Sequence, residues 1–487
     1  MSVTDTSDSS LEGLTHAASS FAATLAFETL PEETVRLAKR CVIDGVGVAL
    51  AGSQQPGMQP LRQHIQRMGG VADARLLAGD GDALPVALAA LWFGTAGHAM
   101  DWDDTQLAEG PGRPYGLLMH PTMPPLAATL SVADYLARQH GVTISGQRLL
   151  AAFMAGFEVG CKVAEAIAPT HYMRGFHTSG TVGTFAAAAA AANMLQLDVP
   201  QTAQALGIAA SMASGIRANF GTMTKPLHVG RAAENGVNAA MLSQVGFTAN
   251  DTALDGQWGY LAVAGPGGES ERVRDRFGNP FALASPGVSI KPYPSGVLTH
   301  PSMDALRALM DEEQLQPGDV TRVVLYAGSN VLGPIRFQRA MTPLEGKFSF
   351  QFLLAAIILR GKVGTAEFTA DFVAGDACQQ MQGLIETQFD QGVEDLGWDK
   401  IRSRIELTTR DGKHYTRWAD ERYRGGPDHP LSDGELESKL RDCASNVVDD
   451  DTLERLISNI WRLDELEDVS VVLADLAQPS PMRTGGS

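Results

Sequence analysis

The chain has 487 residues, of which 44% are hydrophobic, and this length exceeds one ordinary core, so we expect two domains in a globular protein. Its 56 acidic and 38 basic residues give a formal net charge of −18, which argues against binding nucleic acid or anionic membranes. An anionic substrate would therefore require the few cations to be concentrated at one site.

The cysteines and the N-terminal residues indicate a reducing compartment. The four cysteines lie far apart and form no CxxC motif, so neither a disulfide framework nor a cysteine-based metal site is expected. They are Cys41, Cys161, Cys378 and Cys443. The first residues, MSVTDTSDSSLEG, lack the basic and apolar regions of a signal peptide. We therefore predict a cytoplasmic protein.

Helical spacing dominates the chain from about residue 11 to residue 281. Ala-rich segments with apolar residues at helical intervals end at Gly or Pro, as in PEETVRLAKRCVIDGVGVALAG and GQRLLAAFMAGFEVGCKVAEAIA. The uncharged run after Phe176, HTSGTVGTFAAAAAAANMLQL, is too rich in Ala, Gly and Ser to require a membrane span. We interpret it as a buried helix inside a large all-helical domain.

The composition changes around Gly287. There, DVTRVVLYAG predicts a strand, KFSFQFLLAAIILRG a helix, and RIELTTRDGKHYTRWAD two strands joined by an Asp-Gly turn. After Pro427, LSDGELESKLRDCASNVV and TLERLISNIWRLDEL are helical again, and the tail QPSPMRTGGS is expected to be flexible. The sequence predicts a mainly α protein, with a helical domain at 1–286 and 427–487 and a smaller α+β domain at 287–426.

Residues that suit chemistry gather in five short stretches. Four of them lie in the predicted helical domain and the fifth begins the α+β domain, so a site between the domains would follow if the stretches converge. They are HAMDWDDT (98–105), LLMHPTMPP (117–125), RGFHTSGTVGT (174–184), GTMTKPLHVGRAAENG (221–236) and SIKPYPSGVLTHP (289–301).

The first of these stretches allows two interpretations. If the helix predicted for 84–100 continues, then His98, Asp101 and Thr105 lie on one face and could form part of a site. Alternatively, the aspartates end this helix and cap the next one.

Each of the other stretches also has a purely structural interpretation. The structural roles would be a backbone hydrogen bond for His120, a helix start for His177, an exposed loop position for Lys225 and His228, and a strand edge or helix start for Lys291, Tyr293 and His300.

Known cofactor motifs fit the sequence poorly. DWDD lacks a second acidic ligand set, GPGGES (265–270) lacks the GK[ST] ending of a phosphate-binding loop, and an iron–sulfur hydratase would need clustered cysteines. The sequence therefore predicts neither a metal nor an organic cofactor.

Taken in order, the stretches resemble the MmgE/PrpD family. The resemblance covers nearly the whole chain, from LPEETVRLAKRCVIDGVGVALAG through HAMDWDDT, GFHTSGTVGTFAAAAAAA, TKPLHVGRAAENG and IKPYPSGVLTHPSMDAL to KFSFQF. That family contains 2-methylcitrate dehydratases, cis-aconitate decarboxylases and iminodisuccinate epimerases, which act on small polycarboxylates without a cofactor. The resemblance implies a large helical domain formed from both chain ends, a smaller α+β lid and a homodimer.

The resemblance also implies a set of site residues. Lys225 and Lys291 suit carboxylate binding, because each ammonium offers a charge and three donors. His120 and His177 suit proton transfer, because imidazole titrates near neutrality. Asp101 would orient a cation or hold a substrate group. The implied catalytic residues are His120, His177, Asp101, Lys225 and Lys291, and the implied binding residues also include Thr105, His228 and His300.

Two departures bear on the reaction. As the resemblance implies, the decarboxylases have a histidine where this chain reads Ser295-Gly296, and a lid tyrosine where NVLGPIRF has none. We therefore expect dehydration of a hydroxylated polycarboxylate, with decarboxylation as an alternative. Two further alternatives are an epimerase, which returns the proton from the opposite face, and a catalytically silent scaffold that binds carboxylates.

Overall fold

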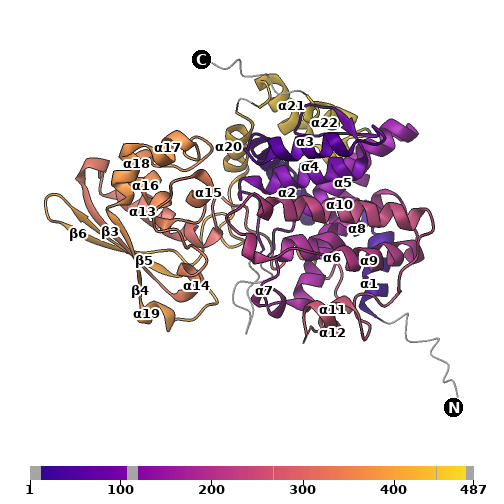
Figure 1. The fold of residues 1–487 in the computed structure, drawn as a ribbon, viewed down its shortest axis with the longest axis horizontal. Helices are drawn as coiled ribbons and strands as arrows, with labels where there is room; N and C mark the ends of the chain where they lie inside the picture. Colours follow the sequence, from indigo (N-terminus) through magenta and orange to yellow (C-terminus); the bar gives the residue numbers. More distant parts are fainter. Residues whose placement is uncertain (1–12, 107–118, 267, 446, 479–487) are drawn as a thin grey trace, which may run out of the picture.

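A computed structural model describes residues 13–106, 119–266, 268–445 and 447–478. Residues 1–12, which belong to the segment used to argue against a signal peptide, lie outside these ranges. Residue 267 of GPGGES and the tail from residue 479 also lie outside them. Helices form most of the described chain, which confirms the prediction of a mainly α protein (Figure 1).

One part of the molecule, which we call the helical body, combines helices from the first half of the chain with helices from its end (Figure 1). These are α1 (Leu14–Thr24), α2 (Glu32–Ser53), α3 (Met58–Met68), α4 (Val86–Ala99), α5 (Met123–His140), α6 (Gly146–Ile167), α7 (Thr170–Met173), α8 (Thr178–Met194), α9 (Val199–Met212), α10 (Thr224–Gln244), α11 (Tyr260–Ala264), α12 (Glu271–Arg274), α20 (Asp433–Ala444), α21 (Asp450–Trp461) and α22 (Ser470–Leu476). Short 3-10 turns accompany them at η1 (Phe27–Thr29), η2 (Arg217–Asn219) and η5 (Leu463–Glu465).

The Ala-rich helix α8 forms the centre of the helical body. Every residue of α8 except Asn193 is buried, and α6 and α10 pack closely against it. Small residues make this approach possible, because a Cβ added to Gly236 of α10 would lie 2.4 Å from the Cβ of Ala187. The prediction that this run is a buried helix is confirmed.

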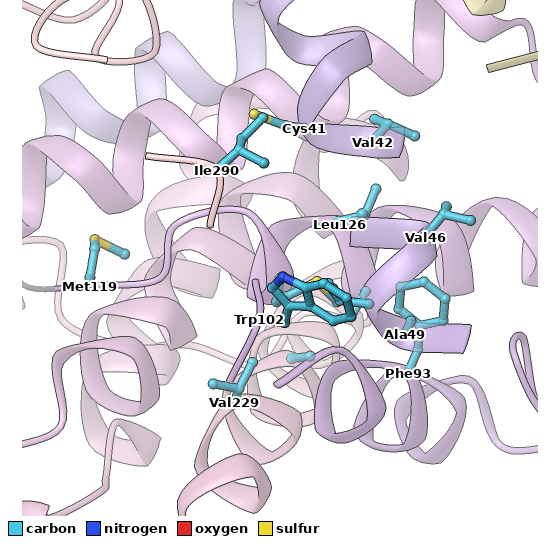
Figure 2. Packing of buried hydrophobic residues seen from close by; sticks show 14 of the residues in the cluster. Cys41, Val42, Val46, Ala49, Phe93, Trp102, Met119, Leu126, Val229 and Ile290 are labelled. Carbon is cyan, nitrogen blue, oxygen red and sulfur yellow. The ribbon is translucent and has the colours of Figure 1, made fainter. Parts of the chain in front are cut away.

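A second part of the core surrounds the start of the polar stretch at 98–105. Figure 2 shows Val42, Val46 and Ala49 of α2 together with Phe93 of α4 and the indole of Trp102. These side chains are buried, so the end of α4 and the polar stretch around Trp102 are anchored in apolar surroundings.

The end of the chain packs against its beginning. Helix α20 lies on α2, and the ammonium of Lys439 donates to Oδ1 of Asp44 at 2.5 Å and to the carbonyl of Trp102 at 2.8 Å. The division at 286/287 and 426/427 into domains stays a prediction.

The description of the helical part as purely helical needs one correction. Strands β1 (Ala74–Arg75) and β2 (Ala83–Leu84) form a short antiparallel pair inside it. Strands of two residues are too short to produce an alternating pattern that sequence periodicity could detect.

The second part of the molecule, which we call the sheet unit, carries a four-stranded sheet in the order β4-β3-β5-β6 (Figure 1). Strands β3 and β4 are parallel and the other pairs are antiparallel. The strands are β3 (Val320–Ala327), β4 (Ile385–Phe389), β5 (Ser403–Thr409) and β6 (His414–Trp418). The helices and turns are η3 (Val297–Thr299), α13 (His300–Glu312), η4 (Pro317–Asp319), α14 (Ser329–Leu332), α15 (Pro343–Gly346), α16 (Phe350–Arg360), α17 (Ala370–Ala374), α18 (Asp376–Gln382) and α19 (Gln391–Glu394).

The predicted strand at DVTRVVLYAG, the KFSF helix and the hairpin are confirmed as β3, α16 and β5–β6. Helices α13 and α16 pack on the sheet. Strand β4 was not predicted, because only Ile385 of its five residues is buried and the sequence shows no apolar alternation there.

Two sequence expectations about the whole chain can be compared with the structure. All four cysteines are buried and free. Within the described residues, no helix combines the length and the apolar character needed to cross a lipid bilayer.

Candidate active site

A cavity of about 750 Å³ is lined by residues from both the helical body and the sheet unit. Six of the residues singled out from the sequence line it together: Asp101, Thr105, His120, His177, Lys225 and Lys291. His228 and His300 are not among the lining residues, so the structure does not place them where a bound molecule would touch them directly.

Asp101 reaches the cavity through a turn and not through a continued helix. Helix α4 ends at Ala99, and Asp101 adopts a positive φ of 54°. This left-handed conformation breaks the helix, so His98, Asp101 and Thr105 do not share a helix face, contrary to the conditional prediction. Thr105 is instead held in the cavity wall by backbone hydrogen bonds with Ser289.

Two lysines meet at the carboxylate of Asp101. Oδ1 of Asp101 lies 2.8 Å from Nζ of Lys225 and 2.9 Å from Nζ of Lys291, which also donates to the Asp101 carbonyl at 2.9 Å. Burial alone would raise the pKa of Asp101, but the two ammonium groups hold it well below its usual range. Two ammonium groups therefore share the single carboxylate of Asp101, and Asp101 alone does not balance their charge.

Lys225 does not occupy the exposed loop position that the structural interpretation allowed. It lies in the first turn of α10, is buried, and has its ammonium 5.2 Å from the ring centre of Phe220 and 5.3 Å from that of Phe348. Burial lowers the pKa of Lys225, while Asp101 raises it.

A further lysine beside this cluster was missed by the sequence analysis. Lys347 is buried and its ammonium donates to the carbonyl of Ala99 at 2.6 Å. Burial lowers the pKa of Lys347 to about 7. The charge of Asp101 opposes this shift, whereas the charges of Lys225 and Lys291 add to it. Its only sequence signal was the KFSF segment, which we interpreted solely as a helix start.

The imidazole of His120 lies between two aspartates. Its Nδ1 is 3.2 Å from Oδ2 of Asp103, and its Nε2 is 3.9 Å from Oδ1 of Asp101. Asp103 also contacts Nδ1 of His98 at 2.9 Å. Burial would raise the pKa of Asp103, but His120 and His98 hold it well below its usual range. Asp103 is therefore the common partner of two imidazoles and not a helix cap.

Asp104 is the aspartate that binds the next helix. It accepts hydrogen bonds from the backbone N–H of Thr122 at 3.3 Å and from its hydroxyl at 2.7 Å, directly before α5. Its position fits the capping interpretation of this stretch.

His177 precedes the first turn of α8 and faces a second histidine. Its Nδ1 lies 3.0 Å from Nδ1 of His228 on α10, so one ring donates and the other accepts. Burial lowers the pKa of His177 well below its usual range, and nearby His98 and Lys225 lower it further. His177 is thus a neutral imidazole, and its Nε2 has no hydrogen-bond partner among the described residues.

His300 occupies a different environment. It is the first residue of α13, is fully buried, and has its ring 5.4 Å from that of Tyr293. This position fits the helix-start role considered for it.

Four side chains near the cavity could offer ligand atoms to a metal ion. Atoms of His98, Asp101, Asp103 and His120 lie within 4.8 Å of one another. However, the ammonium groups of Lys225 and Lys291 already pair with Asp101 and would repel a divalent cation. The charge pattern suits an anionic ligand better than a cation.

The fold and the cavity together define a mainly α protein whose cavity is lined by two buried lysines and two histidines. Models of the MmgE/PrpD N-terminal domain and the MmgE/PrpD C-terminal domain match residues 16–272 and 293–464, and the chain belongs to this family. The resemblance seen in the sequence is confirmed.

Several curated relatives are similar over almost their entire length. The cis-aconitate decarboxylase of Homo sapiens is 29% identical over 464 residues, covering 93% of this chain and 92% of the relative. That of Mus musculus is 29% identical over 466 residues, covering 93% and 91%. That of Aspergillus terreus is 25% identical over 491 residues, covering 96% of both chains. The relatives are enzymes, and their name describes a lyase reaction on a small carboxylate.

Proposed function

We propose that this protein is a cofactor-independent lyase that acts on a small di- or tricarboxylate by moving a proton on the carbon next to a carboxylate. The observation that carries the proposal is the convergence of Lys225 and Lys291 on one oxygen of Asp101, with His120 beside the same oxygen. This arrangement supports the proposal, because two ammonium groups and an imidazole lie beside the same carboxylate.

In the proposed reaction, a substrate carboxylate binds next to the two ammonium groups. His120 takes the proton from the adjacent carbon, and Asp103 stabilises the imidazolium that forms. The electron pair left on carbon is delocalised into the carboxylate, where the lysines stabilise the added negative charge.

The second half of the proposed reaction removes the leaving group. The carbon–oxygen bond breaks as the alkene forms, and the departing hydroxide takes the proton that His120 removed from carbon and leaves as water, which returns His120 to its neutral form. The neutral ring of His177 lines the cavity with an unpartnered Nε2, and it is suited to assist this departure through a hydrogen bond. The hydro-lyase reaction is the first candidate.

Decarboxylation is the second candidate, and the names of the relatives favour it. In that reaction a carbon–carbon bond breaks, carbon dioxide leaves, and the same imidazoles deliver a proton to the remaining carbon. The cavity wall argues for dehydration, because Gly296 and Ile335 line it without offering an ionisable group. An epimerase and a silent carboxylate-binding protein are the remaining alternatives.

A screen for deuterium exchange separates these reactions. The protein is incubated in deuterated water with a panel of di- and tricarboxylates, and the products are followed by NMR. Exchange with loss of water supports the hydro-lyase reaction. Loss of carbon dioxide supports decarboxylation, and exchange with inversion of configuration supports epimerisation. No exchange with any compound would contradict the enzymatic proposal.

Two variants control the screen. Lys225→Met should abolish or strongly reduce any exchange, whereas Lys413→Met, at a lysine side chain that is 66% exposed, should leave it unchanged.

The proposal also covers the oligomeric state of the protein, its cellular location and the position of its site. A homodimer, a cytoplasmic location, and a site between a helical domain and a lid remain predictions. Analytical ultracentrifugation of the purified chain tests the homodimer directly.

A further inference from the structure

The part of the cavity beyond the lysines is large and mostly apolar. Its volume of about 750 Å³ lies in the upper part of the range that drug-sized ligands occupy. Its wall includes the apolar side chains of Met173, Phe220, Leu298, Ile335 and Phe348, of which Phe220 and Phe348 lie beside the ammonium of Lys225. A compact polycarboxylate at the lysines would leave this apolar wall uncovered.

Two arginines line the same cavity. The guanidinium of Arg217 stacks 3.9 Å from the ring centre of Tyr172 and donates to the Tyr172 carbonyl at 3.1 Å. The guanidinium of Arg336 donates to the carbonyl of Phe220. Neither group is within ion-pair distance of a carboxylate in the ranges that the structure describes. In a protein with a net charge of −18, two such cations in one cavity indicate a place for a ligand anion.

Phe220 connects the two groups of cations. Its ring lies 5.2 Å from the ammonium of Lys225 and 4.9 Å from the ring of His177. Its backbone carbonyl accepts from Arg336, and its N–H donates to the carbonyl of Arg217 at 3.0 Å. Lys225 and His177 therefore lie beside the ring of Phe220, and the guanidinium of Arg336 donates to its carbonyl. Arg217 contacts Phe220 through its backbone carbonyl, while its guanidinium lies on the ring of Tyr172.

We propose that the substrate is an elongated anion with two charged ends separated by an apolar segment. One carboxylate binds at Lys225 and Lys291, the apolar segment covers Phe220, and the second anionic group binds Arg217 and Arg336. This inference rests on the proposed function, because the end at the lysines is the end that reacts. It narrows the substrate class from any small polycarboxylate to one with an apolar spacer.

Isothermal titration with simple carboxylates tests the inference. Glutarate has two close carboxylates, suberate has two carboxylates joined by a longer apolar chain, and octanoate has one carboxylate on an apolar chain of similar length. The folded wild-type protein should bind suberate about tenfold or more tightly than either of the others, since only suberate combines a second carboxylate with a long apolar segment. Equal affinity for suberate and octanoate would overturn the proposed second anionic end.

Variants locate the second end. The ratio of suberate to glutarate affinity should fall about tenfold in Arg336→Gln and in Arg217→Gln, because each removes one charged contact with the distal carboxylate. Arg336→Lys should give an intermediate ratio, since the charge remains and the planar fork is lost. Arg231→Gln is the matched control, because Arg231 lies on α10 with its side chain 49% exposed and pairs with Glu234. Its ratio should equal that of the wild type.

Failure of this inference is distinguishable from failure of the proposed function. If Lys225→Met weakens all three ligands but the arginine variants keep the wild-type ratio, the lysine site stands and the elongated substrate is wrong. If Lys225→Met changes the affinity of none of them, or if the wild type binds none, the proposed function and this inference fall together. Thermal melting of each variant verifies that it is folded, and if Arg217→Gln does not fold, Arg336→Gln alone decides the result.

Discussion

The Nδ1 atom of His120 lies 3.2 Å from Oδ2 of Asp103, inside a protein core where the aspartate is almost fully buried. Nε2 of the same ring lies on the side of Asp101, 3.9 Å from its Oδ1. Because Asp103 also holds His98, it fixes two rings at once. Asp103 is therefore a positioning residue whose effect on the reaction passes through His120.

Asp103→Asn should lower kcat by about a hundredfold or more, because an amide neither fixes the tautomer nor stabilises the imidazolium. Steady-state kinetics with the substrate found in the exchange screen measures this. Asp104→Asn is the control, since Asp104 contacts Thr122 and neither imidazole. Equal kcat values for the Asp103 variant and the wild type would contradict the positioning role.

The lysines and the histidines should differ in their kinetic effects. Lys225→Ala should chiefly raise KM, because an ammonium on a carboxylate serves substrate and transition state alike. His120→Ala and His177→Ala should chiefly lower kcat, by about a hundredfold to ten-thousandfold. The measurement is steady-state kinetics on folded variants with the substrate found in the exchange screen. If both histidine variants kept nearly the wild-type kcat, His120 and His177 would return to structural roles.

Removing Asp101 should destabilise the protein in a way that anions repair. Asp101→Asn leaves the buried ammonium groups of Lys225 and Lys291 without their carboxylate, and breaking a buried ion pair typically costs about 3–5 kcal/mol. Added tricarballylate should then raise the Tm of the variant more than that of the wild type, because its carboxylates replace the lost charge.

Glu386→Gln provides the comparison for Asp101→Asn. Glu386 pairs with Arg322 on the surface of the sheet unit, so its loss should change the Tm little and should not create any anion dependence. An Asp101 variant as stable as the wild type, with no response to tricarballylate, would show that the lysines do not need a counter-charge.

The sequence predicted the site residues better than the way in which they meet. Lys225, Lys291, His120 and His177 were singled out because several polar stretches matched the family in order, while each stretch alone also had a structural interpretation. The end of α4 before Asp101 was one of two interpretations left open, since apolar spacing continues to the end of α4 and only the positive φ of Asp101 breaks it. Arg217 and Arg336 also gave no signal, because they lie in irregular segments where no periodicity reports which side chain faces a cavity.

The reaction should not depend on a metal ion. Dialysis against a strong chelator should leave kcat unchanged, since the cations near Asp101 are the ammonium groups of Lys225 and Lys291 and the cysteines are dispersed. Metal analysis of the dialysed protein by mass spectrometry verifies the removal. A loss of activity restored by one divalent metal would instead assign that ion to His98, Asp103 and His120.

The last prediction concerns Asp104 and the pH dependence of stability. Burial raises the pKa of Asp104 to about 8. The hydrogen bonds from Thr122 lower this pKa, and the nearby carboxylates of Asp44 and Asp103 raise it. In the unfolded chain an aspartate titrates near about 3.9. Between these two values the folded protein holds a proton that the unfolded chain has lost, so this group makes the folded state less stable as the pH rises.

Asp104→Asn removes this proton linkage while retaining a side chain that can bond Thr122. The free energy of unfolding of the wild type minus that of the variant should therefore fall between pH 5 and pH 7, by up to about 1.4 kcal/mol per pH unit. Urea titrations at pH 5, 6 and 7 measure this difference in the free energy of unfolding. The contributions of groups that titrate alike in both proteins cancel in the difference. The decline should end above about pH 8, where Asp104 is ionised in both states. A difference that stays constant from pH 5 to pH 7 would mean that Asp104 is already ionised in the folded protein.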